Sequence, residues 1–356
     1  MKYRLSDICD YVKGKIDVAM LDEDTYISTE NMMPNKGGVT KASSLPTVAQ
    51  TQSFSTGDVL VSNIRPYFKK IWFAEYDGGC SNDVLVLRAK EGISKRFLYY
   101  VLADDTFFDY SMATSKGTKM PRGDKTAIME YGIPKFTYEE QEKIAGILGA
   151  LDRKIQLNTA INNNLEQQAQ SIYQQMFVNN RKPQWRLGQL SELVAVKYGK
   201  DHKKLEDGIY PVYGSGGIMR YVEKPLYTGE SVLIPRKGSL NNVLYVNGAF
   251  WSVDTMFYTK MLLPNIAKYV FHFVKDIDLA SLNAGSAVPS MTTNILNALQ
   301  LYIPDGKTLQ KFEELVQPMY STIQENEKQS KKLATMRDTL LPRLMSGELD
   351  VSNIDL

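Results

Sequence analysis

The sequence has few of the residues and runs that mark secreted or membrane proteins. Cys9 and Cys80 are its only cysteines, so it lacks the disulfide framework that stabilises small extracellular domains. Apolar runs such as residues 84–87 are far too short to cross a bilayer, and residues 1–7 turn polar at once, without an apolar signal region. We therefore expect a cytoplasmic protein, and 356 residues are enough for two or three cores.

Excess charge of one sign is also missing. The formal net charge is only +2, which argues against a strongly basic, nonspecific coat for nucleic acid. It does not exclude DNA binding, because local basic loops make the contacts with phosphates. The content of 43% hydrophobic and 23% charged residues is that of ordinary globular domains.

Motifs that would indicate an active site are absent. None of the 14 prolines are adjacent, so the Asn/Asp-Pro-Pro-Tyr/Phe tetrapeptide of amino-methyltransferases cannot occur, and there is no G-x-G-x-x-G fingerprint. Residues 306–308 (Gly-Lys-Thr) resemble the end of a phosphate loop, but Leu301 stands where that loop needs glycine. His202 and His272 are distant in sequence from each other and from both cysteines, which argues against a zinc site. We expect no metal, cofactor or catalytic residue in this chain.

An internal duplication is the first informative feature that is present. The matched segments follow one another in the same order: residues 3–8 return as 185–190, 57–60 as 229–233, 80–83 as 251–254, 117–121 as 285–289, and 133–134 as 303–304. Each match is weak alone, but their shared order at a nearly constant offset indicates two diverged copies of one unit.

Within each copy, the residue pattern changes once along the sequence. Short β-type runs punctuated by Gly, Pro and Asn come first, followed by a long stretch that is typical of one helix. The predicted parts are a mixed α/β domain over residues 1–136, a long helix over 137–182, a second mixed domain over 183–305, and a second long helix with the C-terminal tail over 306–356.

Both long helices carry a heptad seam, apolar at its ends and polar in its middle. The seam residues are Ile144, Leu148, Leu151, Ile155, Asn158, Asn162, Leu165, Ala169, Ile172 and Met176 in the first helix, and Phe312, Leu315, Met319, Thr322, Asn326, Gln329, Leu333, Met336 and Leu340 in the second. An antiparallel pair would place Asn158 and Asn162 against Thr322, Asn326 and Gln329, a polar patch that fixes register. The alternative is two amphipathic helices that each pack on their own domain.

Local basic clusters are the candidate contacts with nucleic acid. Guanidinium groups read guanine edges, lysines neutralise phosphates, and amides such as those of Asn63 and Asn242 read adenine. The candidates are Arg65, Lys69, Lys70, Lys116, Lys119, Arg122 and Lys125 in the first copy, and Lys197, Lys200, His202, Lys203, Lys204, Arg236, Lys237 and Asn241 in the second. Arg65, Lys69 and Lys70 follow Gly57 as Arg236 and Lys237 follow Gly229. For any one of these residues, an ordinary solvated loop is the alternative.

A Ser-x-Asp pair recurs in the two copies, as Ser81 with Asp83 and as Ser252 with Asp254. We expect these pairs to cap a helix or turn that follows a strand. The alternative is that they orient an arginine that faces DNA.

The whole chain resembles the specificity subunits of type I restriction–modification systems. Residues 340–349 (Leu-Leu-Pro-Arg-Leu-Met-Ser-Gly-Glu-Leu) are similar to the family's C-terminal ending, and residues 133–134 followed by 140–148 are similar to the start of its first conserved helix. The Trp-Arg-Leu at residues 185–187 is a third match. Residues 309–314 depart from the pattern, because they lack the Glu-Gln pair at the start of the second helix.

The resemblance implies an α+β fold, with two α/β target-recognition domains joined by an antiparallel pair of long coiled-coil helices. It implies a non-catalytic subunit that binds double-stranded DNA with a bipartite target. The implied partners are two adenine-N6 methyltransferase subunits and the restriction/translocase subunits, which would carry S-adenosylmethionine, ATP and Mg. A helix of about 40 residues is roughly 60 Å long and would act as a rigid spacer. The alternatives are a specificity protein of another restriction class and a non-catalytic tandem-repeat structural or interaction protein.

Overall fold

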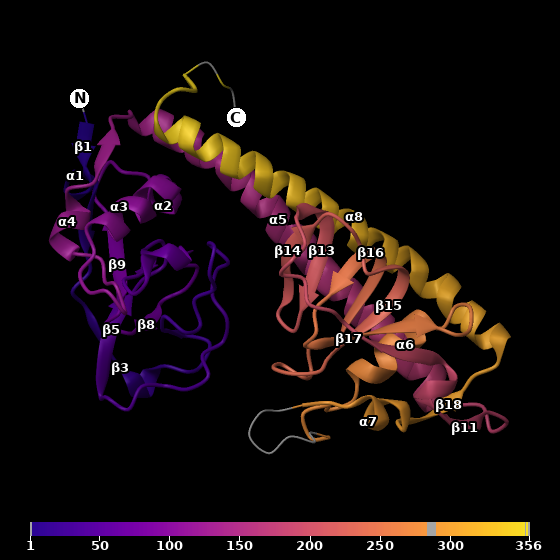
Figure 1. Cartoon of the computed structure of the whole chain (residues 1–356). Helices are drawn as coiled ribbons and strands as arrows, with labels where there is room; N and C mark the ends of the chain where they lie inside the picture. The colour runs from indigo at the N-terminus through magenta and orange to yellow at the C-terminus, as the bar shows by residue number, and fades with distance from the viewer. Residues whose placement is uncertain (1, 283–289, 353, 355–356) are drawn as a thin grey trace. The chain divides into compact units, whose positions relative to one another are not determined.

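The structure is a computed structural model that describes residues 2–282, 290–352 and 354 (Figure 1). Residues 285–289, one member of the repeated motifs, lie outside this part. The chain divides into two compact units: unit 1 is Met1–Thr159 with Glu327–Leu356, and unit 2 is Ala160–Asn326. The division falls within the two long helices, α5 (Tyr138–Tyr173) and α8 (Gly306–Met345), so each unit includes one end of each helix.

In its described residues, unit 1 has short strands and four α-helices that precede α5. Its elements are β1 (Lys2–Arg4), α1 (Leu5–Ile8), β2 (Cys9–Tyr11), β3 (Lys15–Asp17), β4 (Tyr26–Ile27), β5 (Gln50–Phe54), β6 (Val59–Ser62), the 3-10 turn η2 (Pro66–Phe68), β7 (Ile71–Phe73), β8 (Gly78–Cys80), β9 (Val84–Ala89), α2 (Lys95–Ala103), α3 (Asp105–Ala113), α4 (Lys125–Met129) and β10 (Gly132–Pro134). The strands form two four-stranded sheets, β2-β9-β6-β7 and β3-β5-β8-β4, and the two-stranded β1-β10 pair.

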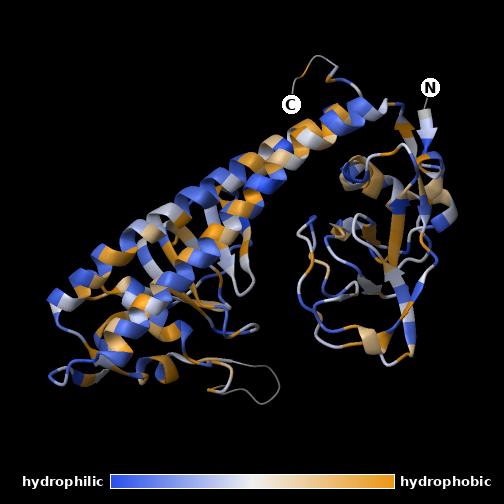
Figure 2. Cartoon of the chain, turned by 180° about the vertical axis from the view of Figure 1, so that it is seen from behind, coloured by the Kyte–Doolittle hydropathy of each residue, from blue (hydrophilic) through white to orange (hydrophobic). Residues whose placement is uncertain are grey.

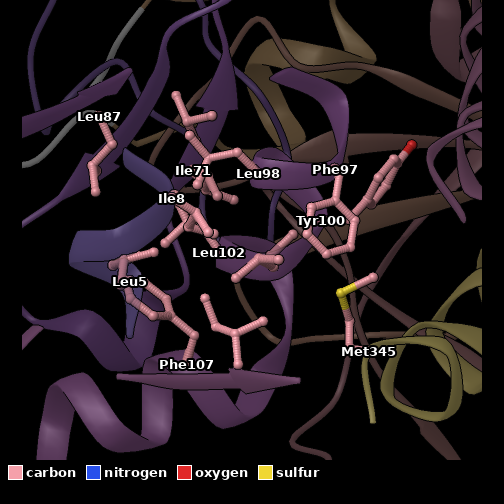
Figure 3. Close-up of a cluster of buried hydrophobic side chains, with 14 of the residues drawn as sticks. Leu5, Ile8, Ile71, Leu87, Phe97, Leu98, Tyr100, Leu102, Phe107 and Met345 are labelled. Carbon is pink, nitrogen blue, oxygen red and sulfur yellow. The ribbon is translucent and has the colours of Figure 1, made fainter. Parts of the chain in front are cut away.

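The main core of unit 1 lies between the β2-β9-β6-β7 sheet and the helices. Strand β6 is a run of buried residues, Val-Leu-Val-Ser, as expected of a central strand covered on both faces. Ile8 and Ile71 meet Leu98 of α2 in this core, and the end of α8 adds Met345 (Figure 3). Helix α5 is fixed to α2 because the Gln141 side chain accepts a 3.0 Å hydrogen bond from the backbone N–H of Ser94. The basic loops described below therefore rest on a packed scaffold.

Unit 2 has one larger sheet. Its elements between the long helices are β11 (Arg186–Gln189), the 3-10 turn η4 (Leu190–Glu192), β12 (Val194–Tyr198), β13 (Asp207–Gly214), β14 (Gly217–Val222), β15 (Tyr227–Pro235), β16 (Leu244–Ser252), β17 (Met256–Met261), α6 (Ala267–Lys275), α7 (Thr293–Asn297) and β18 (Gln300–Ile303). The six-stranded sheet has the order β12-β17-β15-β16-β13-β14, and only β13 and β16 pair in parallel. An aromatic core around Tyr173, Phe177, Tyr269 and Phe312 joins α6 to both long helices.

The structure confirms the duplication but changes the register of two repeated motifs. The backbone N–H of Leu5 donates to Tyr131 O at 2.8 Å, and that of Leu190 donates to Leu299 O at 2.9 Å. The side chain of Asp7 caps the turn in unit 1, as Glu192 does in unit 2. Residues 5–7 (Leu-Ser-Asp) therefore match residues 190–192 (Leu-Ser-Glu), three positions later than expected, and residues 133–134 match 301–302, two positions earlier than the expected 303–304. The expected match at Trp185 was wrong because that indole instead donates to Asp305 Oδ2, at 3.1 Å, beside the start of α8.

Both predicted long helices are present, and within each unit they run antiparallel (Figure 1). Helix α5 continues through a π-helical turn, Gln174–Asn179. In unit 1, Asn158 Nδ2 donates to Gln329 Oε1 at 2.9 Å; in unit 2, Asn326 Nδ2 donates to Asn162 Oδ1 at 2.8 Å. The helices also pack on their own domains, through Leu148 in unit 1 and Phe312 in unit 2. The two alternatives that the sequence left open, helices paired with each other and helices packed on their own domains, therefore both hold.

The expected seam on α8 is wrong at three positions. Leu315 and Met336 are 46% and 52% exposed, and Thr322 is exposed and bonds back to Pro318 O. Residues at the other seam positions of the two helices are at least half-buried, apart from the exposed Gln329: Ile144, Leu148, Leu151, Ile155, Asn158, Asn162, Leu165, Ala169, Ile172, Met176, Phe312, Met319, Asn326, Leu333 and Leu340. The heptad rule fails because α8 is covered by its own domain as well as by α5, which moves the buried face to Val316 and Tyr320. Apolar and polar residues accordingly mix along both helices (Figure 2).

Candidate nucleic-acid interface

In unit 1, two segments far apart in sequence form one basic surface, which we call cluster 1. These are the 63–70 loop, which follows β6, and the 116–125 loop, which leads into α4. Ile64 pairs with Arg122 in an isolated antiparallel bridge, and the backbone N–H of Arg65 donates to Pro121 O at 2.8 Å. The fold therefore brings most of the basic candidates of the first copy to one place.

The cations of the 116–125 loop are exposed and oriented by carboxylates. Lys116 Nζ lies 2.5 Å from Asp124 Oδ2, and Arg122 Nη2 lies 3.1 Å from Asp83 Oδ1. The hydrogen bond from Lys116, together with backbone N–H groups at the start of α4, lowers the pKa of Asp124. Asp83 thus has the arginine-orienting arrangement that was the alternative to a capping role. Lys119 and Lys125 are also exposed in this loop.

Lys69 and Lys70, also in cluster 1, face protein oxygen atoms instead of solvent. Lys69 Nζ lies 2.7 Å from Asp105 Oδ2, and Lys70 Nζ donates to Thr29 O at 2.6 Å. Burial lowers the pKa of Lys70. These two lysines hold the 63–70 loop in place.

Two polar atoms at the base of cluster 1 have no hydrogen-bond partner within the described part of the chain. They are Oδ1 of Asn63, whose side chain is buried, and Nε of Arg65. Buried polar atoms are nearly always paired, so such exceptions indicate a strained or functional position. Both atoms belong to residues that the sequence analysis proposed as base contacts.

Unit 2 carries a matching surface, cluster 2, at the end of β15. The backbone N–H of Arg236 donates to Thr255 O at 2.8 Å, as that of Asn63 donates to Asp83 O, and Arg236 O accepts from Met291 N at 2.9 Å, as Asn63 O accepts from Gly123 N. Arg236 therefore occupies the place of Asn63, and the expected match with Arg65 is wrong. The constant sequence offset predicted the wrong partner for Arg236, because β15 is nine residues long whereas β6 has four.

An exposed aromatic residue completes cluster 2. The guanidinium of Arg236 lies 5.4 Å from the ring centre of Tyr198 and also donates to Asp254 O. Lys197 precedes Tyr198 at the end of β12, and Lys200 follows it, with its backbone N–H bonded to Ser252 O. Lys237, next to Arg236, pairs with Ser290. Sequence reasoning missed Tyr198, although an aromatic residue between two lysines was visible.

The other candidates of unit 2 are either exposed to solvent or hydrogen-bonded within the protein. Lys203 and Lys204 are exposed beyond Lys200, whereas the Asn241 side chain is hydrogen-bonded. Its Nδ2 donates to Asp278 Oδ1 at 2.9 Å, and its Oδ1 accepts from Ala280 N at 3.0 Å, so both atoms that would read adenine are used. The adenine-reading role of Asn241 stays a prediction, which requires that these two hydrogen bonds break. Asn242 likewise donates to Ser215 O.

The Ser-x-Asp pairs lie one position out of register with each other. The backbone N–H of Val84 donates to Ser81 O, and that of Met256 donates to Val253 O, so Ser81 matches Val253 instead of Ser252. At Ser81 the backbone oxygen closes the turn that precedes β9.

Two further searches cover the described residues. No group of three or more His, Cys, Asp and Glu side chains in them is arranged to hold a metal ion. Among these residues, no helix is long and apolar enough to cross a membrane.

Known proteins match the chain along most of its length. Residues 1–167 and 183–335 each match the family described as type I restriction modification DNA specificity domain. The type I restriction enzyme MjaIX specificity subunit of Methanocaldococcus jannaschii is 24% identical over 317 residues, covering 74% of this chain and 71% of that protein. The HindI specificity subunit of Haemophilus influenzae is 29% identical over 189 residues, covering 50% and 40%. The solved S subunit from M. genitalium has a similar fold, with a TM-score of 0.58, 19% identity and coverage of 97% and 96%.

Proposed function

The chain belongs to the family of type I restriction–modification DNA specificity subunits, and we propose that it recognises a split DNA target, one half with each unit. The observation that carries the proposal is that the family match occurs twice and that each matched copy holds a basic cluster at an equivalent place. In both copies that place is the end of a central strand, β6 or β15. A subunit of this kind recognises DNA and catalyses no reaction.

Recognition divides into positioning and reading. The exposed lysines, Lys116, Lys119 and Lys125 in cluster 1 and Lys197 and Lys200 in cluster 2, would bind phosphates, which fixes register and makes affinity dependent on salt. Arg122 and Arg236 would reach base edges, since a guanidinium reads guanine in two contacts. Two half-site readers in one chain would bind a whole site far more tightly than either would alone, because the second contact is intramolecular.

The partners would be two adenine-N6 methyltransferase subunits and the restriction/translocase subunits. We propose that they dock along the helix pair and carry S-adenosylmethionine, ATP and Mg, while this chain holds no cofactor. The methyltransferase would then flip its adenine out of the duplex that this chain grips. The proposed location is the cytoplasm, where DNA is present and cysteines such as Cys9 and Cys80 stay reduced.

The test is a map of methylation. The chain is co-expressed with its cognate methyltransferase subunit in a host without adenine methylation, and N6-methyladenine is located by long-read sequencing. We expect two short sequence blocks separated by a fixed, unspecified gap. A continuous motif would keep DNA recognition but reject the two-half reading. No methylation, with both subunits shown to associate, would favour a structural repeat protein.

A further inference from the structure

The most exposed aromatic side chains of cluster 1 lie at the tip of the 63–70 loop. Tyr67 and Phe68 in the turn η2 are 49% and 38% exposed, and their ring centres lie 4.6 Å apart. Exposing two adjacent aromatic rings to water is unfavourable, because each ring could bury roughly 150 Å² or more of its surface in contact with other groups. Such a pair at a basic surface calls for a ligand with flat apolar faces.

The chain holds this tip in a conformation that is costly by itself. Arg65 and Lys69, on either side of η2, have φ of 50° and 51°, in the left-handed region that residues other than glycine rarely adopt. A second left-handed pair, Asn35 and Lys36, donates 2.8 Å backbone hydrogen bonds to Phe68 O and Lys69 O. Strained backbone of this kind persists where the surroundings determine it fully, and it is concentrated at ligand-binding sites.

Ion pairs complete the brace around the tip. Asp105 of α3 binds Lys36 at 2.8 Å and Lys69 at 2.7 Å, one lysine through each carboxylate oxygen. Lys70 is fixed to Thr29 O on the other side. The two rings are therefore presented on a rigid support, which lowers the entropy lost when they bind.

Unit 2 shows that the fold does not require exposed aromatic residues here. Gly238 stands where Arg65 stands, because Lys237 pairs with Ser290 as Ile64 pairs with Arg122, and Gly238 also has a positive φ, 84°. The large apolar residue that follows it, Leu240, is 2% exposed. The equivalent loop thus buries its apolar side chain, and the exposed pair in unit 1 is a feature of that copy alone.

We propose that Tyr67 and Phe68 form an aromatic wedge that inserts at a base step of double-stranded DNA, in the half-target that unit 1 reads. This rests on the proposed function and names one of its specificity determinants. DNA is the occupant that fits, because the neighbouring 116–125 loop presents the exposed Lys116 and Lys119 for the phosphates on either side of such a step. Apolar side chains that wedge between bases prefer pyrimidine–purine steps, which unstack most easily, so the wedge would select sequence by deformability.

The test uses the full-length chain and random-sequence DNA duplexes. Wild type is first used to select duplexes, which gives the recognised motif. Binding to that motif is then compared for wild type, Tyr67→Ala/Phe68→Ala, Tyr67→Phe, and Tyr138→Ala, an exposed aromatic residue of the same unit outside cluster 1. Purines of the motif are replaced one at a time by 2-aminopurine, whose fluorescence rises when it is unstacked.

We expect the double variant to bind about 10- to 100-fold more weakly, as loss of base–aromatic stacking does elsewhere. It should lose sequence preference in one half of the motif only, and the fluorescence rise at one step should disappear. Tyr67→Phe and Tyr138→Ala should behave as wild type does. An unchanged motif and affinity in the double variant, or no unstacked step in wild type, would overturn the wedge and leave the proposed function intact. If wild type selects no motif, the proposed function itself fails, and the wedge with it.

Discussion

The buried ammonium of Lys268 offers the sharpest test of how unit 2 is held together. Lys268 is 0% exposed, and its Nζ lies 2.9 Å from Glu230 Oε1 on β15 and 2.6 Å from Glu313 Oε1 on α8. One lysine of α6 thus joins the sheet to the long helix. Burial alone would raise the pKa of Glu230, but hydrogen bonds from Tyr245 and Lys268 outweigh it and lower that pKa.

Lys268→Met keeps the length of the side chain and removes its charge. Two carboxylates then lose their shared cation in a low-dielectric place, and breaking a buried pair in this way costs about 3–5 kcal/mol. For a unit of this size, this lowers the melting temperature by roughly 6–20 °C, at about 2–4 °C per kcal/mol. Chemical denaturation gives the magnitude, and hydrogen exchange of the α6 amides assigns the loss to unit 2.

Two further variants make the result decisive. Lys311→Met removes an exposed lysine of α8 and should change the free energy of unfolding by less than about 0.5 kcal/mol. Adding Glu230→Gln and Glu313→Gln to Lys268→Met should recover part of the loss, because no buried charge then stays unpaired. If the denaturation midpoints of Lys268→Met and Lys311→Met both equal that of the wild type, the buried ion pairs do not stabilise unit 2.

Three further predictions concern DNA binding and acid stability. Arg236→Ala should cost about 1–3 kcal/mol and relax specificity at one position of one half-site, whereas Lys119→Ala should weaken binding to all sequences and lower the salt slope by about one; competition binding at several salt concentrations separates the two. Asn241→Ala should leave the recognised motif unchanged and cost less than about 1 kcal/mol of stability, since water can replace the partner that the exposed Asp278 and Ala280 lose, and a changed motif would restore Asn241 as a base contact. His272 is kept neutral, because burial first and Lys275 second lower its pKa to about 3. Its contribution is therefore complete above the unfolded pKa of about 6.5 and is lost at about 1.4 kcal/mol per pH unit as pH falls toward 3. His272→Gln should flatten this limb of a stability–pH curve, and an equal slope in both proteins would contradict the assignment.

Local patterns predicted the large elements of the fold and failed where distant segments meet. The two long helices follow from heptads and from the absence of proline in residues 139–180, both of which are local. The register of the repeats does not, because strands differ in length between copies: Arg236 looked equivalent to Arg65 by offset and occupies the place of Asn63 by hydrogen bonding. Side-chain periodicity alone could not reveal a shift of two or three residues.

The candidate DNA contacts show the same limit at the level of single side chains. Lys69 and Lys70 form a basic pair in sequence, yet their ammonium groups are taken by Asp105 and Thr29, residues that no local pattern connects to them. Tyr67 and Phe68 lie beside them in sequence, and only the fold shows that their rings are exposed. Exposure and pairing are tertiary properties, so sequence located the clusters but could not say which members are free to bind.

In each copy, a small group of polar side chains connects the recognition domain to the two long helices; we call this group the joint. In unit 1, Tyr100 of α2 donates to Asp152 of α5 at 2.7 Å, and Arg337 of α8 pairs with the same carboxylate at 2.8 Å. In unit 2, His272 of α6 bonds Tyr320 of α8 at 2.9 Å and also contacts the side chain of Gln170 of α5.

These two buried polar joints occupy equivalent places with different chemistry. Tyr100 follows the start of α2 by as many residues as His272 follows the start of α6, and Asp152 lies as far along α5 as Tyr320 lies along α8. A reader of DNA can change its loops freely only while its attachment to the helix stays fixed, since a small tilt would move every base contact. A charged Tyr–Asp–Arg arrangement and a neutral His–Tyr–Gln arrangement are not interchangeable, because a domain without Tyr100 would leave Asp152 Oδ2 without its hydrogen-bond donor, although Arg337 would still pair with Oδ1. A recognition domain moved between relatives therefore keeps its full stability only with matching residues on the long helices, and exchange of residues 1–136 for a domain that lacks Tyr100 should cost about 1–3 kcal/mol of stability even where its loops read DNA.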